Sequence, residues 1–167
     1  MFALAIGVVF MWFFMYTCYI LSFATFFMLL TGFFQSFLKF KILAANHLTF
    51  MVLISIIYAF TETLVIFFFV GTGVSIKEYV DRHHLSPEFK KRSLAVKRKV
   101  YPPLLLNMLF MIILFVLVGA VDTHRIPFWI YLIIFIGCIM DYLRIKFIQN
   151  ECFGENTKII LEMSGIK

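Results

Sequence analysis

Apolar residues fill four long runs along the chain, and short polar stretches separate them. Each run holds about 20 residues or more, the length that an α-helix needs to cross the hydrocarbon of a bilayer. The pattern therefore predicts an all-α polytopic integral membrane protein, with residues 1–167 in a single membrane domain and four transmembrane helices. We place these spans at about 4–28, 48–72, 102–121 and 127–145.

The polar stretches predict how the spans are connected. Residues 29–46 carry the first charges of the chain, and we expect this segment to leave the hydrocarbon near Gly32 or Gln35 and to lie along the interface. The glycines at 71 and 73 suit the end of the second span, because glycine readily caps a helix. Only four polar residues and a short lead-in separate spans three and four, so these two should form an antiparallel hairpin.

The connection at 74–101 is rich in Lys and Arg. Ser86 suits an N-cap and Pro87 suits the first helical turn, so the sequence predicts a short basic helix between spans two and three. We expect it to lie in the membrane interface, with its basic side chains facing anionic headgroups. The side chains assigned to this contact are Lys90, Lys91, Arg92, Lys97, Arg98 and Lys99.

Composition agrees with a membrane protein, because 63% of the residues are hydrophobic and 14% are charged, against about a quarter charged in soluble domains. The net charge of +6 is concentrated, with twelve of the fifteen Lys and Arg in 77–99 and 144–167. Such clustering reports topology and argues against nucleic-acid binding. It predicts that the 74–101 connection, the 146–167 tail and both termini lie on the cytoplasmic or matrix side of a bacterial plasma membrane or mitochondrial inner membrane.

Glu62 is the single ionisable side chain between Lys41 and Lys77, apart from His47 and the tyrosine hydroxyl groups. A carboxylate at bilayer depth is costly, so its presence calls for a partner or a function. Steps of three or four residues place His47, Ser55 and Tyr58 on the same helical face as Glu62. The sequence alone leaves two readings open: hydrogen bonds that hold membrane helices together, and a pathway for protons or ions.

The depth of Glu62 in its span suggests which residues contact it. Asn107 of span three and Asp141 of span four fall in the same inner half of the membrane, so we expect both to converge with Glu62. A neutral carboxyl group bonded to Asn107 is the least costly arrangement, because burial disfavours the charged form. Arg144 lies one turn beyond Asp141 and should pair with it or reach toward the headgroups.

His47 and His124 fall at similar depth, at the starts of spans two and four, and form a candidate pair for haem or metal binding, with Asp122 nearby. The sequence requires no cofactor. It also holds no nucleophile elbow, phosphate-binding glycine loop or zincin motif, which leans against an enzyme.

Three functional hypotheses follow. The first is a non-catalytic small membrane subunit that assembles with itself or with other membrane proteins, such as those of an energy-transducing complex, because phenylalanine-rich surfaces fit partner helices. The second is a proton or ion pathway through Glu62, supported by Ser55, Tyr58, Asn107 and Asp141. The third is a haem- or metal-bearing anchor that uses His47 and His124.

Overall fold

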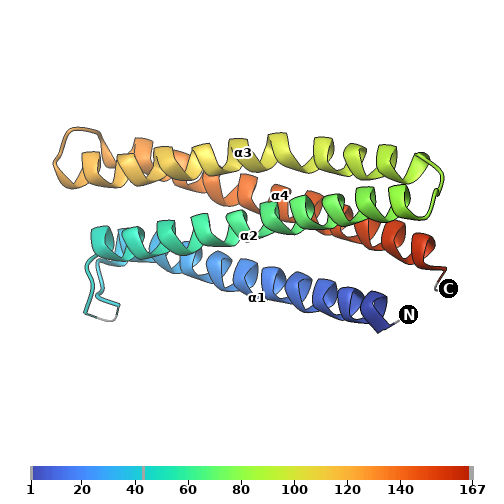
Figure 1. The fold of residues 1–167 in the computed structure, drawn as a ribbon. Helices are drawn as coiled ribbons and strands as arrows, with labels where there is room; N and C mark the ends of the chain where they lie inside the picture. The colour runs from blue at the N-terminus through green and yellow to red at the C-terminus, as the bar shows by residue number, and fades with distance from the viewer. Residues whose placement is uncertain (1, 43, 166–167) are drawn as a thin grey trace.

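Four long α-helices form an elongated bundle in which consecutive helices run antiparallel (Figure 1). The computed structural model describes residues 2–42 and 44–165, with side chains from Met11 onward. Each helix is long and apolar enough to cross a membrane, so the chain has the architecture of a four-span integral membrane protein. The helices are α1 (Phe2–Leu38), α2 (His47–Arg82), α3 (Glu88–Asp122) and α4 (Phe128–Ser164).

The bundle is longer than a bilayer is thick. The helices contain 35 to 37 residues, or about 52–56 Å at about 1.5 Å per residue, against about 30 Å of hydrocarbon. We call the end that holds the α2–α3 connection, the start of α1 and the end of α4 the basic end. The end that holds the α1–α2 and α3–α4 connections is the opposite end (Figure 1). The helices therefore extend well past the predicted spans.

The prediction of a separate interfacial helix between spans two and three is wrong. Residues 88–100 are the first turns of α3, which continues through Pro102 and Pro103. Ser93, Val96 and Val100 of these turns are buried, so the segment packs lengthwise against its neighbours instead of lying on a membrane surface. Packing of its apolar side, which a single sequence window does not reveal, outweighs the loss of two backbone donors at the prolines.

Ion pairs fix the same turns of α3 to the neighbouring helices. Arg92 lies 2.5 Å from Glu162 of α4, and Lys99 lies 2.5 Å from Glu151 of α4. Lys90 bonds to Asp81 of α2, which lowers the pKa of that carboxyl, and Arg92 likewise lowers the pKa of Glu162. Half of the six side chains assigned to headgroups are thus engaged within the protein.

Two glycines that suggested helix ends lie inside continuous helices. Gly32 lets α1 approach α2 closely, because a Cβ atom there would come within 2.7 Å of Ile54 and 3.1 Å of Met51. Gly73 lies beneath the side chain of Lys97, which a Cβ atom would overlap. Both glycines make room for atoms of a neighbouring helix. Neither ends its own helix, because α1 continues to Leu38 and α2 continues to Arg82.

Candidate functional site

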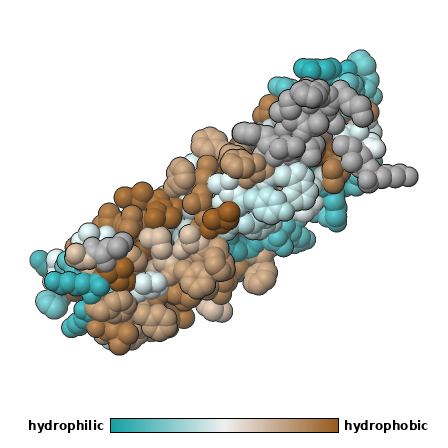
Figure 2. All heavy atoms as spheres, turned by 90° about the horizontal axis from the view of Figure 1, so that it is seen from below, coloured by the Kyte–Doolittle hydropathy of each residue, from teal (hydrophilic) through white to brown (hydrophobic). Residues whose placement is uncertain are grey.

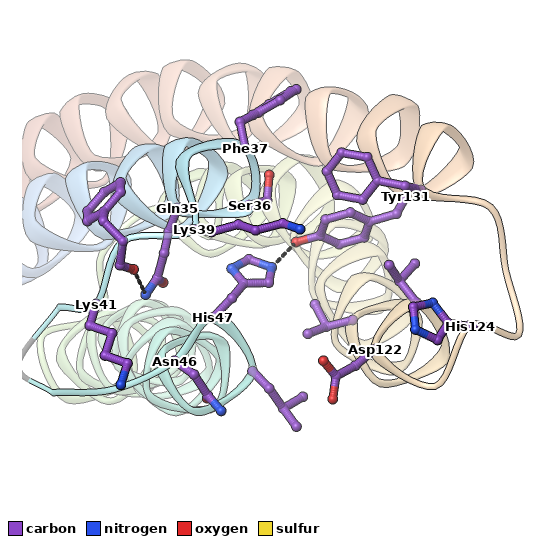
Figure 3. A pocket seen from close by; sticks show the side chains of 15 residues that line it. Gln35, Ser36, Phe37, Lys39, Lys41, Asn46, His47, Asp122, His124 and Tyr131 are labelled. Carbon is purple, nitrogen blue, oxygen red and sulfur yellow. Dashed lines mark hydrogen bonds between the residues drawn. The ribbon is translucent and has the colours of Figure 1, made fainter.

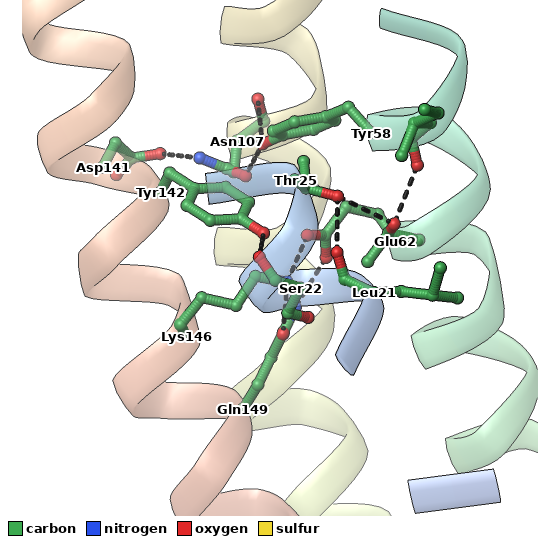
Figure 4. Close-up of polar contacts among 12 residues, drawn as sticks. Leu21, Ser22, Thr25, Tyr58, Glu62, Asn107, Asp141, Tyr142, Lys146 and Gln149 are labelled. Carbon is green, nitrogen blue, oxygen red and sulfur yellow. Dashed lines mark hydrogen bonds and ion pairs between the residues drawn. The ribbon is translucent and has the colours of Figure 1, made fainter. Parts of the chain in front are cut away.

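Buried polar side chains meet in the middle of the bundle (Figure 4), at the boundary between two clusters of its hydrophobic core. We call this set the polar layer. Most of its members are at most 2% exposed, although a bundle of this composition could have filled the same space with apolar groups. The layer comprises Thr25, Tyr58, Thr61, Glu62, Asn107, Asp141, Tyr142, Lys146 and Gln149.

Glu62 is fully buried and forms an ion pair with α4. Lys146 Nζ donates to Glu62 Oε1 at 2.5 Å, and Gln149 Nε2 donates to Glu62 Oε2 at 2.6 Å. Lys146 also donates to Gln149 Oε1 at 2.9 Å and lies 4.8 Å from the centroid of the Tyr142 ring. Both carboxylate oxygens are occupied, and two helices far apart in sequence are joined by a closed triangle of bonds.

Asn107 and Asp141 form a second network instead of contacting Glu62. Tyr58 donates to the amide oxygen of Asn107, and Asn107 Nδ2 donates to Asp141 Oδ2 at 2.9 Å. Arg144 lies 3.6 Å from the other Asp141 oxygen, as one of its two predicted roles required. Asn107 and Asp141 therefore do not bond to Glu62 as we expected, although both networks lie in the same layer of the bundle (Figure 4).

Hydroxyl groups of α1 and α2 complete the polar layer. Thr25 and Thr61 share a hydrogen bond of 3.1 Å, and the Tyr142 hydroxyl donates to the Ser22 carbonyl at 2.8 Å. The Ser55 hydroxyl bonds to the Met51 carbonyl of its own helix, and no bond to another helix places it in the layer among the described residues. The layer thus draws on all four helices.

Sequence reasoning missed Lys146 and Gln149 as the partners of Glu62. The signal was present, because Tyr142, Lys146 and Gln149 follow a spacing of four and three residues and so share one face of a helix. Lys146 was counted only among the basic residues that orient the bundle. A cation near the predicted end of a span is usually assigned to the headgroups, and here α4 continues as helix well past it, to Ser164.

An apolar block separates the polar layer from the opposite end. Its side chains are buried, and α2 rises by about 16 Å between His47 and Tyr58. Its apolar side chains offer no hydrogen-bonding groups to a water molecule or a proton. Its members include Met51, Ile54, Leu114 and Phe135.

A pocket of about 700 Å³ opens at the opposite end (Figure 3). His47 and His124 both line it, and His47 Nε2 is hydrogen-bonded to the Tyr131 hydroxyl at 2.8 Å. Gln35 also lines the pocket and is 1% exposed. Among the described residues, no group of three His, Cys, Asp or Glu side chains could hold a metal ion. The pocket thus contains the predicted histidines without a recognisable ligand set.

Comparison with known proteins finds no relative. No protein-family model matches the chain, and neither the curated proteins nor the solved structures contain a match. The site must therefore be interpreted from its own chemistry.

Proposed function

We propose that this protein is a non-catalytic small integral membrane subunit that binds apolar helices of another membrane protein or of further copies of itself. One observation carries the proposal. Helix α1 contains 37 residues and no charged side chain, whereas α3 and α4 are strongly charged at the same end of the bundle.

The lengths of the apolar surfaces do not match across the bundle. The uncharged helix α1 is about 56 Å long, whereas the apolar part of α3, from Tyr101 to Val121, is only about 32 Å long. If the bundle tilts, the hydrocarbon covers a different stretch of helix on each side of the bundle. The length of helix that it covers is nevertheless the same on every side. About 30 Å of hydrocarbon can therefore cover α3 and still leave part of α1 outside.

The uncovered surface carries large apolar side chains. We call it the α1–α2 face and define it by the exposed residues Trp12, Phe13, Tyr16, Phe67, Val70 and Val74. On α4 the same level of the bundle holds Phe153, which packs on Phe68 of α2, beside the charged Glu151 and Glu155. Figure 2 shows apolar side chains over the lower-left part of the bundle, with pale and hydrophilic ones toward the upper right and hydrophilic ones at the left tip. Partner helices would remove this surface from water.

Site-directed photo-crosslinking in native membranes tests the proposal. A photoreactive residue at Phe13, which is 69% exposed, should give a discrete protein adduct, and so should one at Phe67. The matched control is Val116 of α3, which is 63% exposed and should react mainly with lipid. Adducts of equal yield at all three positions, together with migration as a monomer on a native gel, would refute the proposal.

In this proposal the basic end lies on the cytoplasmic or matrix side of a bacterial plasma membrane or mitochondrial inner membrane. The excess of Lys and Arg at the basic end supports this orientation. Arg98 and Lys91, which are exposed, would contact anionic headgroups there.

A proton or ion pathway is the second candidate function, and the observation that favours it is the Glu62–Lys146 pair. Its carboxylate and ammonium are deep in the bundle and connect toward the basic end through Gln149. The apolar block weighs against a complete route. Proton flux into liposomes that is abolished by Glu62→Gln would support this candidate, and flux equal to that of empty liposomes would dismiss it.

A further inference from the structure

Gln35 holds a hydrogen-bond acceptor in the pocket at the opposite end that has no partner in the described part of the protein. Its Nε2 group donates to the carbonyls of Phe40 at 2.9 Å and Ala45 at 3.2 Å. Those two bonds use both amide hydrogens and fix the orientation of the side chain. The remaining atom, Oε1, is buried and unpaired, and leaving such an atom without a donor is costly. A ligand in the pocket could supply the donor that Gln35 Oε1 lacks among the described residues.

His47 holds a second unpaired hydrogen-bonding atom among the described residues that line this pocket. Its Nδ1 atom is buried without a partner among the described residues, while Nε2 shares a hydrogen bond with the Tyr131 hydroxyl. If the hydroxyl donates, Nδ1 carries a hydrogen and is a free donor. If Nε2 donates, the hydroxyl hydrogen is free instead. Either tautomer therefore offers one donor to a ligand.

Charges of both signs line the same pocket. Lys39 and Lys41 follow α1, and Asp122 ends α3. None of the three forms an ion pair within residues 2–42 and 44–165. The start of α2 also borders the pocket through Asn46, His47 and Leu48, and the start of a helix favours anions. Asn46 already caps the N–H group of Thr49, so the earlier N–H groups are the ones that could bind an anion. Figure 3 shows Lys39 near the hydrogen-bonded pair of His47 and Tyr131, with Asp122 on another wall.

We propose that this pocket binds a zwitterionic headgroup that combines a phosphate with a primary ammonium. The phosphate would be bound by Lys39, Lys41 and the start of α2, with His47 or Tyr131 donating to it. The ammonium would donate to Gln35 Oε1 or Asp122. A primary ammonium is required because a quaternary one has no hydrogen to give to an acceptor.

The size and position of the pocket suit such a ligand. Its volume of about 700 Å³ lies within the usual range for small-molecule sites of about 300–1,000 Å³. It opens at the opposite end of the bundle, which would lie at the depth of lipid headgroups in the proposed membrane orientation. Phe37, Leu48 and Phe128 contribute apolar walls that can contact the glycerol region of a phospholipid.

Native mass spectrometry of the purified full-length protein tests the proposal. The protein is delipidated and then titrated with phosphatidylethanolamine, phosphatidylcholine or phosphatidylglycerol. We expect one tightly bound phosphatidylethanolamine, with the choline and glycerol lipids at least about tenfold weaker, since each loses a charge-assisted hydrogen bond. Soluble phosphoethanolamine, titrated by calorimetry, distinguishes the two sources: binding as tight as that of the lipid identifies a free zwitterion, and weaker binding identifies the membrane lipid.

Variants of the pocket and a matched control complete the test. Asp122→Asn and Lys39→Gln should each weaken phosphatidylethanolamine binding about tenfold. Arg125→Gln changes a charge at the same end outside the pocket and should leave it unchanged. Lys41→Gln replaces Lys39→Gln if that variant does not fold, as judged by size-exclusion chromatography. Equal retention of the three lipids, or retention indifferent to the pocket variants, would mean a pocket filled only by water or by bulk lipid and would overturn the proposal.

Discussion

The polar layer and the pocket at the opposite end both place polar side chains inside an apolar bundle, but they differ in how completely those groups are paired. In the polar layer, every buried side-chain nitrogen or oxygen has a hydrogen-bond partner among the described residues. In the pocket, Gln35 Oε1 and His47 Nδ1 have no such partner among them. A closed network holds helices together, whereas an open one is available to a ligand.

The surroundings explain why this difference matters. Glu62 is fully buried between two hydrophobic clusters, so its carboxylate cannot exchange its partners for water, whereas the Lys146 side chain is 19% exposed. The pocket opens to the exterior, so a molecule can enter it beside Gln35 and His47. Removing one partner should therefore be expensive in the layer and mild in the pocket.

The largest effect is expected from Glu62→Ala, which leaves the Lys146 ammonium buried without its counter-charge. Breaking a buried ion pair in this way typically costs about 3–5 kcal/mol in the free energy of unfolding. Reversible unfolding in mixed micelles, followed by circular dichroism, measures the change. A decrease of less than about 1 kcal/mol in the free energy of unfolding would show that the layer tolerates the loss of a partner as well as the pocket does.

A triple variant provides the control for that experiment. Glu62→Met, Lys146→Met and Gln149→Met together remove the whole triangle and leave no unpaired group. Because apolar replacement of a complete buried pair is often neutral or stabilising, the triple variant should be more stable than Glu62→Ala by several kcal/mol.

The effect of Glu62→Ala should depend on pH. The lone Lys146 ammonium can become neutral by releasing a proton, so the deficit in stability relative to wild type shrinks as the pH rises. Unfolding measured at several pH values checks the prediction, and a deficit that grows as the pH rises would argue against a charged pair.

A tyrosine hydroxyl group can be removed from each of the two regions. Tyr58→Phe deprives the buried Asn107 amide oxygen of its donor and should cost about 1–2 kcal/mol. Tyr131→Phe deprives His47 of its partner beside an open pocket, where water can substitute, and should cost less than about 1 kcal/mol. Equal losses of stability would mean that the pocket is sealed like the layer.

The smallest effect is expected outside both regions, at the exposed Arg92–Glu162 pair. Glu162→Gln should shift the melting temperature far less than any variant of the layer, because solvent screens exposed ion pairs. Arg92 lowers the pKa of Glu162, so the contribution of the pair is present above the unfolded pKa and disappears as the pH falls through the lower folded value. Comparing melting temperatures at neutral and acidic pH detects this loss, and a loss on raising the pH would contradict it.

Much of the fold follows from the sequence alone. Four apolar runs of sufficient length require four helices, because lipid leaves backbone groups no other partners. Glu62 was also recognisable, since a carboxylate among so many apolar residues demands a partner. Tyr58 and Met51 share its helical face and are buried with it.

Only the tertiary structure decided which residues meet. Lys146 reaches Glu62 across the bundle, because the packing of α2 against α3 and of α3 against α4 places residues 84 positions apart at the same level, a register that no local pattern encodes. The basic turns before Pro102 join α3 because Val96 and Val100 are buried in the hydrophobic core of the bundle. Hydrophobic periodicity and length are local properties, so the sequence determined the number and kind of elements. Pairing and burial depend on contacts between distant segments, so they emerged only once the helices were packed.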